Sequence, residues 1–475
     1  MTGSSPPLTL HPDRLLPADP TTRQVARSLY SAVANRPIFS PHGHVDAGVL
    51  ARDVPFGDPS ILLISPDHYV TRVLHSVGVS MRDLGVGPSA ADFDPRAAWK
   101  LLCEHWGAFL GTPSRFWLEA ELADIFGIDV QPSRETADAI YDQITDRLAQ
   151  DAYRPRSLFK RFNITVLATT DDPASDLADH RALSTIPGFE GAVIPTFRPD
   201  VHLNPAREGW AEAVAQLGDV TGLDTANFGQ YLDALRARRR YFIEHGAIAT
   251  DYGVPDTGSE PLDHDDAARL HVRGLTAGLS AAEAKAYRGN MLFEMARMSI
   301  EDGLVMQFHP GVLRNHHRPT LQEYGADTGH DLPLHTEYSE GLRPLLEAFG
   351  TDARLRLGLF TVDETAFGRD IAPLAGFYPS VYAGAPWWFL DAPDSIARYR
   401  SIVTESAGFY KTAGFVDDTR AYCSIPARHD MSRRSDAAYL ARLVVEHRMS
   451  EDDAHRVIGD LVTTIPRQVF SRTRD

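Results

Sequence analysis

The sequence predicts a (β/α)8 barrel, in which eight parallel strands alternate with helices. Three observations support this prediction: short apolar runs recur along the chain, each run ends abruptly in polar residues, and helical stretches separate the runs. This alternation is typical of parallel strands in βαβ units. An open, doubly wound sheet is the competing architecture, but it usually has fewer strands. The expected strands are residues 37–40, 164–170, 192–197, 247–250, 304–308, 355–361, 380–383 and 413–416.

The interval between the first and second expected strands is too long for a simple loop. Within it, Trp99, Leu102 and Trp106 follow the i, i+3, i+7 spacing of one helical face. We therefore expect a helical insertion after the first strand, at residues 75–160. The chain as a whole, residues 1–475, is predicted to form one catalytic barrel domain.

The overall charge excludes some classes of partner. The chain has 47 lysine and arginine residues against 64 aspartate and glutamate residues, a formal net charge of −17. Such an acidic chain is a poor binder of nucleic acid or of an anionic membrane. It can still bind a small anionic substrate, because a local arginine cluster dominates within a Debye length of about 8 Å.

The cysteines and the chain's hydrophobic pattern favour a cytoplasmic protein. Its two cysteines, Cys103 and Cys423, form neither a CxxC pair nor a disulfide framework. The N-terminal residues lack the apolar core of a signal peptide, and no apolar run reaches the length of about 18 residues that spans a membrane. Cys423 has no evident partner for nucleophilic catalysis, so we expect a small buried side chain there.

Two histidines directly after the first expected strand form the strongest local signal. His42 and His44 flank Gly43, and side chains at i and i+2 of an extended segment point to the same side. Two imidazoles placed in this way at a barrel mouth can bind one Zn²⁺-like ion. Two nearby histidines are more often part of a polar turn, but the position at a strand end favours a metal site.

An acidic residue and an arginine follow the eighth expected strand. Because the first and eighth strands become neighbours when a barrel closes, Asp418 is expected to face His42 and His44. A carboxylate beside a cation keeps a low pKa and can still accept a proton from an acidified carbon. Arg420 lies two residues further on, on the same side as Asp418. The alternative is an ordinary surface ion pair between the two, which contributes little.

Other strand ends supply groups suited to an anionic sugar. His309 follows the fifth expected strand, and Arg314 and Arg198 lie beyond other strand ends. A guanidinium can bind a carboxylate through two parallel hydrogen bonds. Trp387 and Trp388 follow the seventh strand and offer faces for stacking, although paired tryptophans are equally common in cores.

One further candidate precedes the predicted insertion. Tyr69, in the triplet Asp67-His68-Tyr69, is placed where it can reach over the barrel mouth as a proton donor or acceptor. The chain has no P-loop, no GxGxxG fingerprint after a strand, no GxSxG elbow and no zinc-finger spacing.

The ordered set of motifs resembles the uronate isomerase family of the amidohydrolase superfamily. No single motif is decisive, but their joint order along the chain is specific. The motifs are PxxSPHGHVD at 37–46, PDHY at 66–69, TTDDP at 169–173, FRPD at 197–200, QFHPGVLRNH at 307–316, APWWF at 385–389 and DDTRAYCSIPARHD at 417–430.

This resemblance implies a distorted (β/α)8 barrel of the amidohydrolase type with a helical insertion. It also implies conversion of D-glucuronate to D-fructuronate and of D-galacturonate to D-tagaturonate. A single divalent metal, commonly zinc, is implied at His42, His44 and Asp418, and its requirement is less strict than in the hydrolytic relatives. The family's motif tyrosine and arginines correspond to Tyr69, Arg420 and Arg314.

Two positions depart from the family pattern. The family often has Asp-His-Gly after the fourth strand, whereas this chain has Asp251-Tyr252-Gly253, so a tyrosine stands where the family has that histidine. The sixth strand ends in Asp363 rather than in a histidine, which removes a ligand of the superfamily's two-metal hydrolases. This difference favours a one-metal site.

We expect an isomerase that moves a proton between C2 and C1 of an open-chain hexuronate through a cis-enediol. Asp418 is the expected base, Tyr69 or His42 would manage hydroxyl protons, and Arg420 and Arg314 would hold anionic groups. The main alternative is a one-metal hydrolase of a sugar-acid lactone, ester or amide, and a second is a barrel that binds sugars without converting them. The resemblance also leads us to expect a homo-oligomer.

Overall fold

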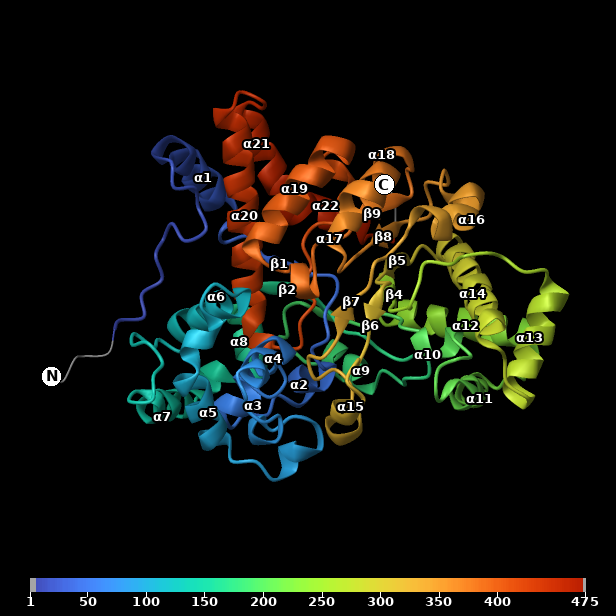
Figure 1. Cartoon of the computed structure of the whole chain (residues 1–475), viewed down its shortest axis with the longest axis horizontal. Coiled ribbons are helices and arrows are strands. Elements are labelled where there is room, and N and C mark those ends of the chain that lie inside the picture. Colours follow the sequence, from blue (N-terminus) through green and yellow to red (C-terminus); the bar gives the residue numbers. More distant parts are fainter. Residues whose placement is uncertain (1–5, 473–475) are drawn as a thin grey trace.

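The computed structural model describes residues 6–472, and its strands lie in the centre of the molecule (Figure 1). All strands of the two main sheets are parallel. The first sheet has the order β1-β2-β3, and the second has the order β4-β5-β8-β9. These strands are β1 (Ile38–Ser40), β2 (Ile164–Ala168), β3 (Ala192–Ile194), β4 (Ala249–Tyr252), β5 (Val305–Phe308), β8 (Leu357–Leu359) and β9 (Val381–Ala383).

Single bridges join the two sheets into a closed wall. Phe197 pairs with Thr250 between the sheets, and Ala383 pairs with Thr412 at the far edge of the second sheet. The wall closes where the backbone N–H of His44 donates to the carbonyl oxygen of Thr419 over 3.0 Å. The architecture is therefore the predicted barrel in a distorted form.

The eighth expected strand is the main difference from the sequence prediction. Residues 413–416 pack in the wall but form no regular strand. Gly414 within this segment has a φ of +80°, which takes the backbone out of the extended region. A ladder of strand hydrogen bonds cannot continue through such a residue, so only the bridge at Thr412 remains.

A short antiparallel ribbon, which the sequence did not predict, follows the fifth strand. It consists of β6 (Val312–Leu313) and β7 (Leu332–Pro333). The ribbon joins the two ends of the long connection that carries Arg314 and Asp327. A two-residue pairing is too short to produce a recognisable alternation of apolar and polar residues.

Helices surround the strands, and many of them gather at opposite ends of the molecule (Figure 1). In the first half of the chain they are α1 (Pro20–Val33), α2 (Ala47–Arg52), α3 (Pro59–Leu63), α4 (His68–Ser76), α5 (Pro95–Glu104), α6 (Pro113–Ala120), α7 (Ala137–Leu148), α8 (Pro155–Arg161), α9 (Ala178–Ser184), α10 (Asp200–Leu203), α11 (Trp210–Thr221) and α12 (Phe228–Glu244). In the second half they are α13 (His264–Thr276), α14 (Ala281–Asp302), α15 (Arg318–Tyr324), α16 (Ser339–Phe349), α17 (Glu364–Ala366), α18 (Ala372–Phe377), α19 (Pro393–Ala407), α20 (Ile425–Val445), α21 (Glu451–Gly459) and α22 (Ile465–Val469).

The long interval between β1 and β2 is helical, with α5, α6 and α7 at one end of the molecule (Figure 1). Trp99 and Leu102 are fully buried on α5, and Trp106 is buried in the short helical turn that follows. Pro113 begins α6, capped by the side chain of Thr112. The helices of this interval share an apolar core with β1 and β2. The division of the chain into a barrel and an insertion at residues 75–160 stays a prediction.

Two other expectations can be compared with the structure. Cys103 and Cys423 are both free and buried, which agrees with the structural role expected for Cys423. Among residues 6–472, no helix has the length and apolar character needed to cross a membrane.

Candidate active site

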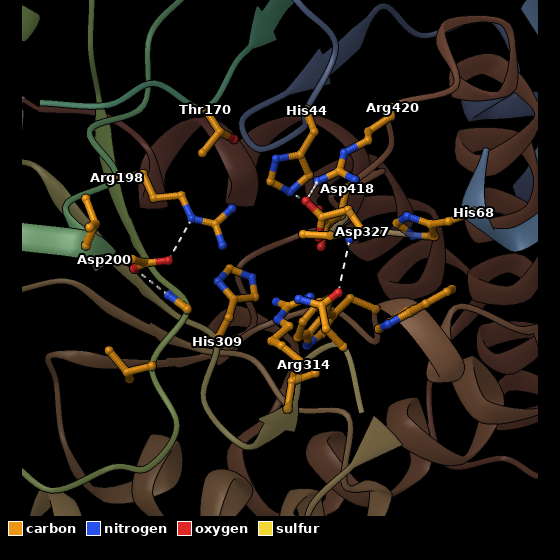
Figure 2. A pocket seen from close by; sticks show the side chains of 18 of the residues that line it. His44, His68, Thr170, Arg198, Asp200, His309, Arg314, Asp327, Asp418 and Arg420 are labelled. Carbon is orange, nitrogen blue, oxygen red and sulfur yellow. Dashed lines mark hydrogen bonds and ion pairs between the residues drawn. The ribbon is translucent and has the colours of Figure 1, made fainter. Parts of the chain in front are cut away.

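A cavity of about 620 Å³ opens at the carboxyl ends of the strands (Figure 2). Of the ten site residues predicted from the sequence, nine line this cavity, and the tenth, His42, is buried beside them. The barrel thus brings together side chains that are far apart in the sequence, as expected for this edge of the fold. The nine lining residues are His44, Tyr69, Arg198, His309, Arg314, Trp387, Trp388, Asp418 and Arg420.

The carboxylate of Asp418 lies between the two histidines that follow β1. One carboxylate oxygen, Oδ1, is 3.3 Å from Nε2 of His42 and 2.9 Å from Nε2 of His44. The arrangement arises because the segment after β1 lies against the segment after residue 416 where the barrel closes. Gly43 permits the close approach, since a Cβ there would lie 3.3 Å from a carboxylate oxygen of Asp417 and 3.4 Å from the carbonyl oxygen of Ala168.

A second buried pair faces this group from the neighbouring sheet. Nδ1 of His309, just beyond β5, is 2.8 Å from Oδ1 of Asp251 on the adjacent strand β4. The other carboxylate oxygen of Asp251 is 3.4 Å from Nε of Arg198. The imidazole of His309 stacks on that of His42, with 4.8 Å between ring centres. The sheet register therefore fixes His309 beside Asp251, and the ring stack places it beside His42.

These contacts shift the pKa values of the groups in a consistent pattern. Burial alone would raise the pKa of Asp418, but His42 and His44 outweigh it and hold that pKa well below its usual range. Burial opposes protonation of His42, yet Asp418 and Asp251 raise its pKa. Burial lowers the pKa of His44 and of His309. The site thus favours an ionised Asp418.

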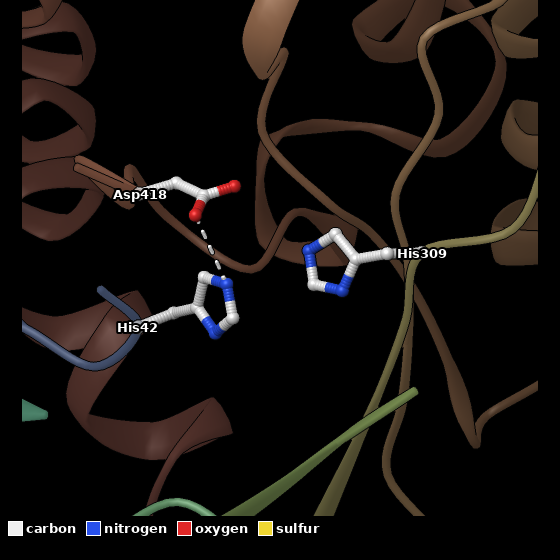
Figure 3. A group of neighbouring side chains, drawn as sticks. All are labelled: His42, His309 and Asp418. Carbon is white, nitrogen blue, oxygen red and sulfur yellow. Dashed lines mark ion pairs between the residues drawn. The ribbon is translucent and has the colours of Figure 1, made fainter. Parts of the chain in front are cut away.

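The same residues fit a divalent cation. Ligand atoms of His42, His309 and Asp418 lie within 4.8 Å of one another, and their side chains point toward a common point from three segments (Figure 3). Nε2 of His309 is buried without a hydrogen-bond partner among residues 6–472. Its other ring nitrogen binds Asp251, an arrangement typical of metal-ligating histidines. Imidazole and carboxylate donors suit zinc and related divalent ions.

Three arginines project into the cavity (Figure 2), and each is held by a carboxylate. The distance from Arg420 Nη2 to Asp327 Oδ2 is 2.9 Å, from Arg314 Nη1 to Asp331 Oδ2 2.8 Å, and from Arg198 Nε to Asp200 Oδ2 2.8 Å. Each arginine side chain remains partly exposed. They can therefore bind an anion while their partners fix their orientation.

Aromatic side chains form another part of the cavity wall. Trp388 meets Tyr69 edge to face, with 4.5 Å between ring centres, and Trp387 lies beside His309 at 5.0 Å. The indole N–H groups of both tryptophans are buried without a partner within the described residues. Tyr69 lies in the first turn of α4, where the Asp67 side chain caps the helix by accepting from the Tyr69 backbone N–H.

Unusual backbone angles concentrate around this cavity. Of the nine non-glycine residues with positive φ in the described chain, four line it: Asn315, Asp327, Trp388 and Asp418. Asparagine and aspartate tolerate this region, but a tryptophan at φ +53° is a clear outlier. Such strain persists only where the surroundings impose it and is often found at functional sites.

Sequence reasoning missed the acidic partners of the arginines and the possible ligand role of His309. Asp327 and Asp331 lie in the long connection around the β6–β7 ribbon, where no periodic pattern indicates their position. Asp251 could have been paired with His309, because both lie at the ends of consecutive strands that become neighbours in a barrel. Asp363, at the sixth strand end, instead caps α17.

Comparison with known proteins supports the family resemblance. The family model for glucuronate isomerase matches residues 20–470. A uronate isomerase of Corynebacterium efficiens is 50% identical over 97% of this chain and 98% of its own, and one of Rhizorhabdus wittichii is 50% identical over 98% and 99%. The crystal structure of glucuronate isomerase from Caulobacter crescentus superposes with a TM-score of 0.96 at 45% identity, covering 99% of this chain and 98% of that one. The resemblance seen in the motifs is therefore confirmed, and this chain belongs to the glucuronate isomerase family.

Proposed function

We propose that this protein is a uronate isomerase that converts D-glucuronate to D-fructuronate and D-galacturonate to D-tagaturonate. Family membership over nearly the whole chain supports the activity. One observation carries the assignment to this cavity: the ionised carboxylate of Asp418, held by His42 and His44, faces a space bordered by arginines. This arrangement provides a base and an anion-binding wall in one site.

The proposed reaction moves one proton and one carbonyl group. In the open-chain aldose, Asp418 removes the proton from C2. The electron pair of that C–H bond forms the C1–C2 double bond, the π pair of the C1 carbonyl moves to O1, and O1 takes a proton from Tyr69 or His42 to give a cis-enediol. Asp418 then returns its proton to C1 while the group that protonated O1 recovers the hydroxyl proton of O2, which gives the ketose. The two sugars are isomers, so no oxidant, reductant or water is consumed.

The other side chains of the cavity bind and orient the substrate. Arg420, Arg314 and Arg198 are placed to hold the substrate carboxylate and the developing enediolate oxygen. Preorganised donors of this kind contribute roughly 3–4 kcal/mol each to transition-state stabilisation. Tyr69 would move hydroxyl protons, and Trp387 and Trp388 would shield the sugar from water.

We infer that the site holds one divalent metal ion, with zinc as the expected ion. His42, His44 and Asp418 are the expected ligands, and the free Nε2 of His309 makes that residue a further candidate. When bound, such an ion polarises and orients substrate oxygens. The proton transfers themselves are assigned to side chains of this chain.

The test is proton NMR of the purified protein with D-glucuronate and, separately, D-galacturonate in D2O. Appearance of the matching ketose, with deuterium incorporated at C2 of the recovered aldose, would support isomerisation through an enediol. Parallel samples with a chelator determine how strictly activity needs the metal. Absence of both ketoses would contradict the proposal, and sugar-acid lactones, esters and amides would then be screened as substrates of a hydrolase.

Two wider expectations accompany this function. We expect a homo-oligomer, which size-exclusion chromatography with light scattering would detect as a mass that is a multiple of 52.4 kDa. We also expect a cytoplasmic enzyme, which cell fractionation would test.

A further inference from the structure

A buried guanidinium lies behind the cavity wall and contacts several segments that build it. Arg428, in the first turns of α20, is completely buried. Its Nη1 is 2.7 Å from Oδ2 of Asp391, which directly follows the short helix Trp388–Leu390. Its Nε donates to the hydroxyl of Ser424 over 3.0 Å. Neither Arg428 nor Asp391 lines the cavity itself.

The same guanidinium contacts the ring of Tyr69. The central carbon of Arg428 lies 4.5 Å from the centre of the Tyr69 ring and 3.7 Å from that of Trp117. Trp117 in turn meets Tyr69 edge to face at 5.3 Å, and Trp388 meets it from another direction at 4.5 Å. The tyrosine ring is therefore confined by neighbours from α6, α20 and the loop after β9.

We propose that Arg428 and Asp391 form a positioning pair that holds Tyr69 in the orientation required for proton transfer at the cavity. This inference rests on the proposed isomerase function. The pair connects three parts of the site: α4 with Tyr69, the loop after β9 with Trp388, and the start of α20, which follows Asp418 and Arg420. Neither member of the pair touches the substrate.

Electrostatics gives the pair a second effect on the same tyrosine. Burial raises the pKa of Tyr69, and the positive charge of Arg428 opposes that rise. A phenol beside a fixed cation is a better proton donor than one in an apolar pocket. Replacing a buried ion pair by well-packed apolar groups is often neutral or stabilising. The test must therefore separate the positioning of Tyr69 from any contribution of the pair to stability.

The chain contains a matched pair that serves as a control. Arg400 on α19 and Asp436 on α20 are also almost completely buried, with Nε–Oδ1 and Nη2–Oδ2 distances of 2.5 and 3.0 Å. Arg400 and Arg428 each have one buried guanidinium nitrogen without a partner in the described part of the chain. Arg400 and Asp436 do not line the cavity. A variant of this pair therefore measures the loss of stability from disturbing a buried ion pair that does not hold Tyr69.

The test compares Arg428→Lys with Arg400→Lys, each made in the parent and in a Tyr69→Phe background. A lysine keeps the charge but not the planar fork. For Arg428→Lys we expect kcat to fall by roughly 10- to 100-fold with little change in KM, as for a misplaced reacting group. In the Tyr69→Phe background, the same change should reduce kcat by less than about twofold further, because coupled residues are not additive. Arg400→Lys should lower the melting temperature and leave kcat within about twofold of its background in both cases.

Two results would overturn the inference. One is a kcat near the parent value in Arg428→Lys with only the melting temperature reduced. The other is an equal loss of kcat in the parent and Tyr69→Phe backgrounds. Asp391→Asn, which removes the partner charge but keeps the side-chain shape, provides the same comparison if Arg428→Lys fails to fold. An inactive parent protein would instead contradict the proposed function, and the inference would fall with it.

Discussion

Two walls of the cavity are built in different ways. On one side, β4, β5, β8 and β9 form a parallel sheet in regular register, which places Asp251 beside His309. On the other side, the segment after β1 meets the segment around Asp418 without a strand ladder. The backbone of Asp418 has a φ of +42° there. A regular strand could not present its carboxylate from that conformation, so the irregular seam allows the placement of the proposed base.

The largest expected effect concerns the irregular seam, where the segment after β1 meets the segment around Asp418. Asp418→Asn should reduce kcat by roughly 10³-fold, because the amide cannot accept the C2 proton. Asparagine has nearly the same shape and tolerates positive φ, so the variant should fold, with a lower melting temperature because it loses the carboxylate charge that His42 and His44 stabilise. Ketose formation is followed by NMR and folding by circular dichroism. Turnover within about tenfold of the parent would remove Asp418 as the base.

The next largest effect concerns anion binding beside the seam. Arg420→Lys should reduce kcat/KM by roughly 10²-fold, because an ammonium group cannot reproduce the two-point contact of the guanidinium. Asp327→Asn should have a smaller effect, since it removes only the group that orients Arg420. Steady-state kinetics on D-glucuronate measures both. Unchanged kcat and KM in Arg420→Lys would exclude a direct contact with the substrate.

A substitution in the regular wall, formed by β4, β5, β8 and β9, should reduce activity less. Asp251→Asn removes the carboxylate that fixes the ring of His309, and loss of such an outer partner typically costs 10- to 100-fold in metal affinity or activity. We expect about a tenfold loss. Metal content by elemental analysis and kcat should fall together if His309 acts through a bound ion. A variant with parent-like metal content and activity would show that this wall has only a structural role.

The difference between the walls also explains what the sequence could predict. Seven of the eight expected strands are present. In each, the apolar run forms regular backbone hydrogen bonds with a neighbouring strand. The eighth could not be recognised as irregular. Residues 413–416 are as apolar as the others, and a glycine alone does not reveal the positive φ of Gly414, since Gly358 lies in the regular strand β8. The placement of His42, His44 and Asp418 followed from barrel closure alone.

Other features had no local signal. The partners of Arg314 and Arg420 lie in a connection held by a two-residue ribbon, and so short a pairing leaves no periodicity. Arg428 sits in a motif that suggested only the family, and its contact with Tyr69 depends on how α4 packs against α20. Such contacts are set by tertiary packing of distant segments.

The smallest expected effect concerns Asp171, at the cavity end of β2 beside the seam. Burial raises its pKa to about 6, although the Thr169 hydroxyl, which donates to it over 2.6 Å, opposes the rise. A carboxyl group whose pKa is raised on folding destabilises the fold as it ionises. The penalty therefore grows from about pH 4, is complete above about pH 6, and is on the order of 3 kcal/mol.

Asp171→Asn should remove this pH dependence, because the amide is neutral and its oxygen can still accept from Thr169. The melting temperature of the variant relative to the parent should rise by roughly 2–3 °C between pH 4 and pH 8. Asp172→Asn is the matched control with the opposite sign. Burial alone would raise the pKa of Asp172, but His202 outweighs it and lowers that pKa. Its stabilising charge is present at pH 8 and is lost in acid, so the relative melting temperature of that variant should fall over the same range. If the relative melting temperatures of the two variants changed in the same direction between pH 4 and pH 8, burial would not be the cause of the raised pKa of Asp171.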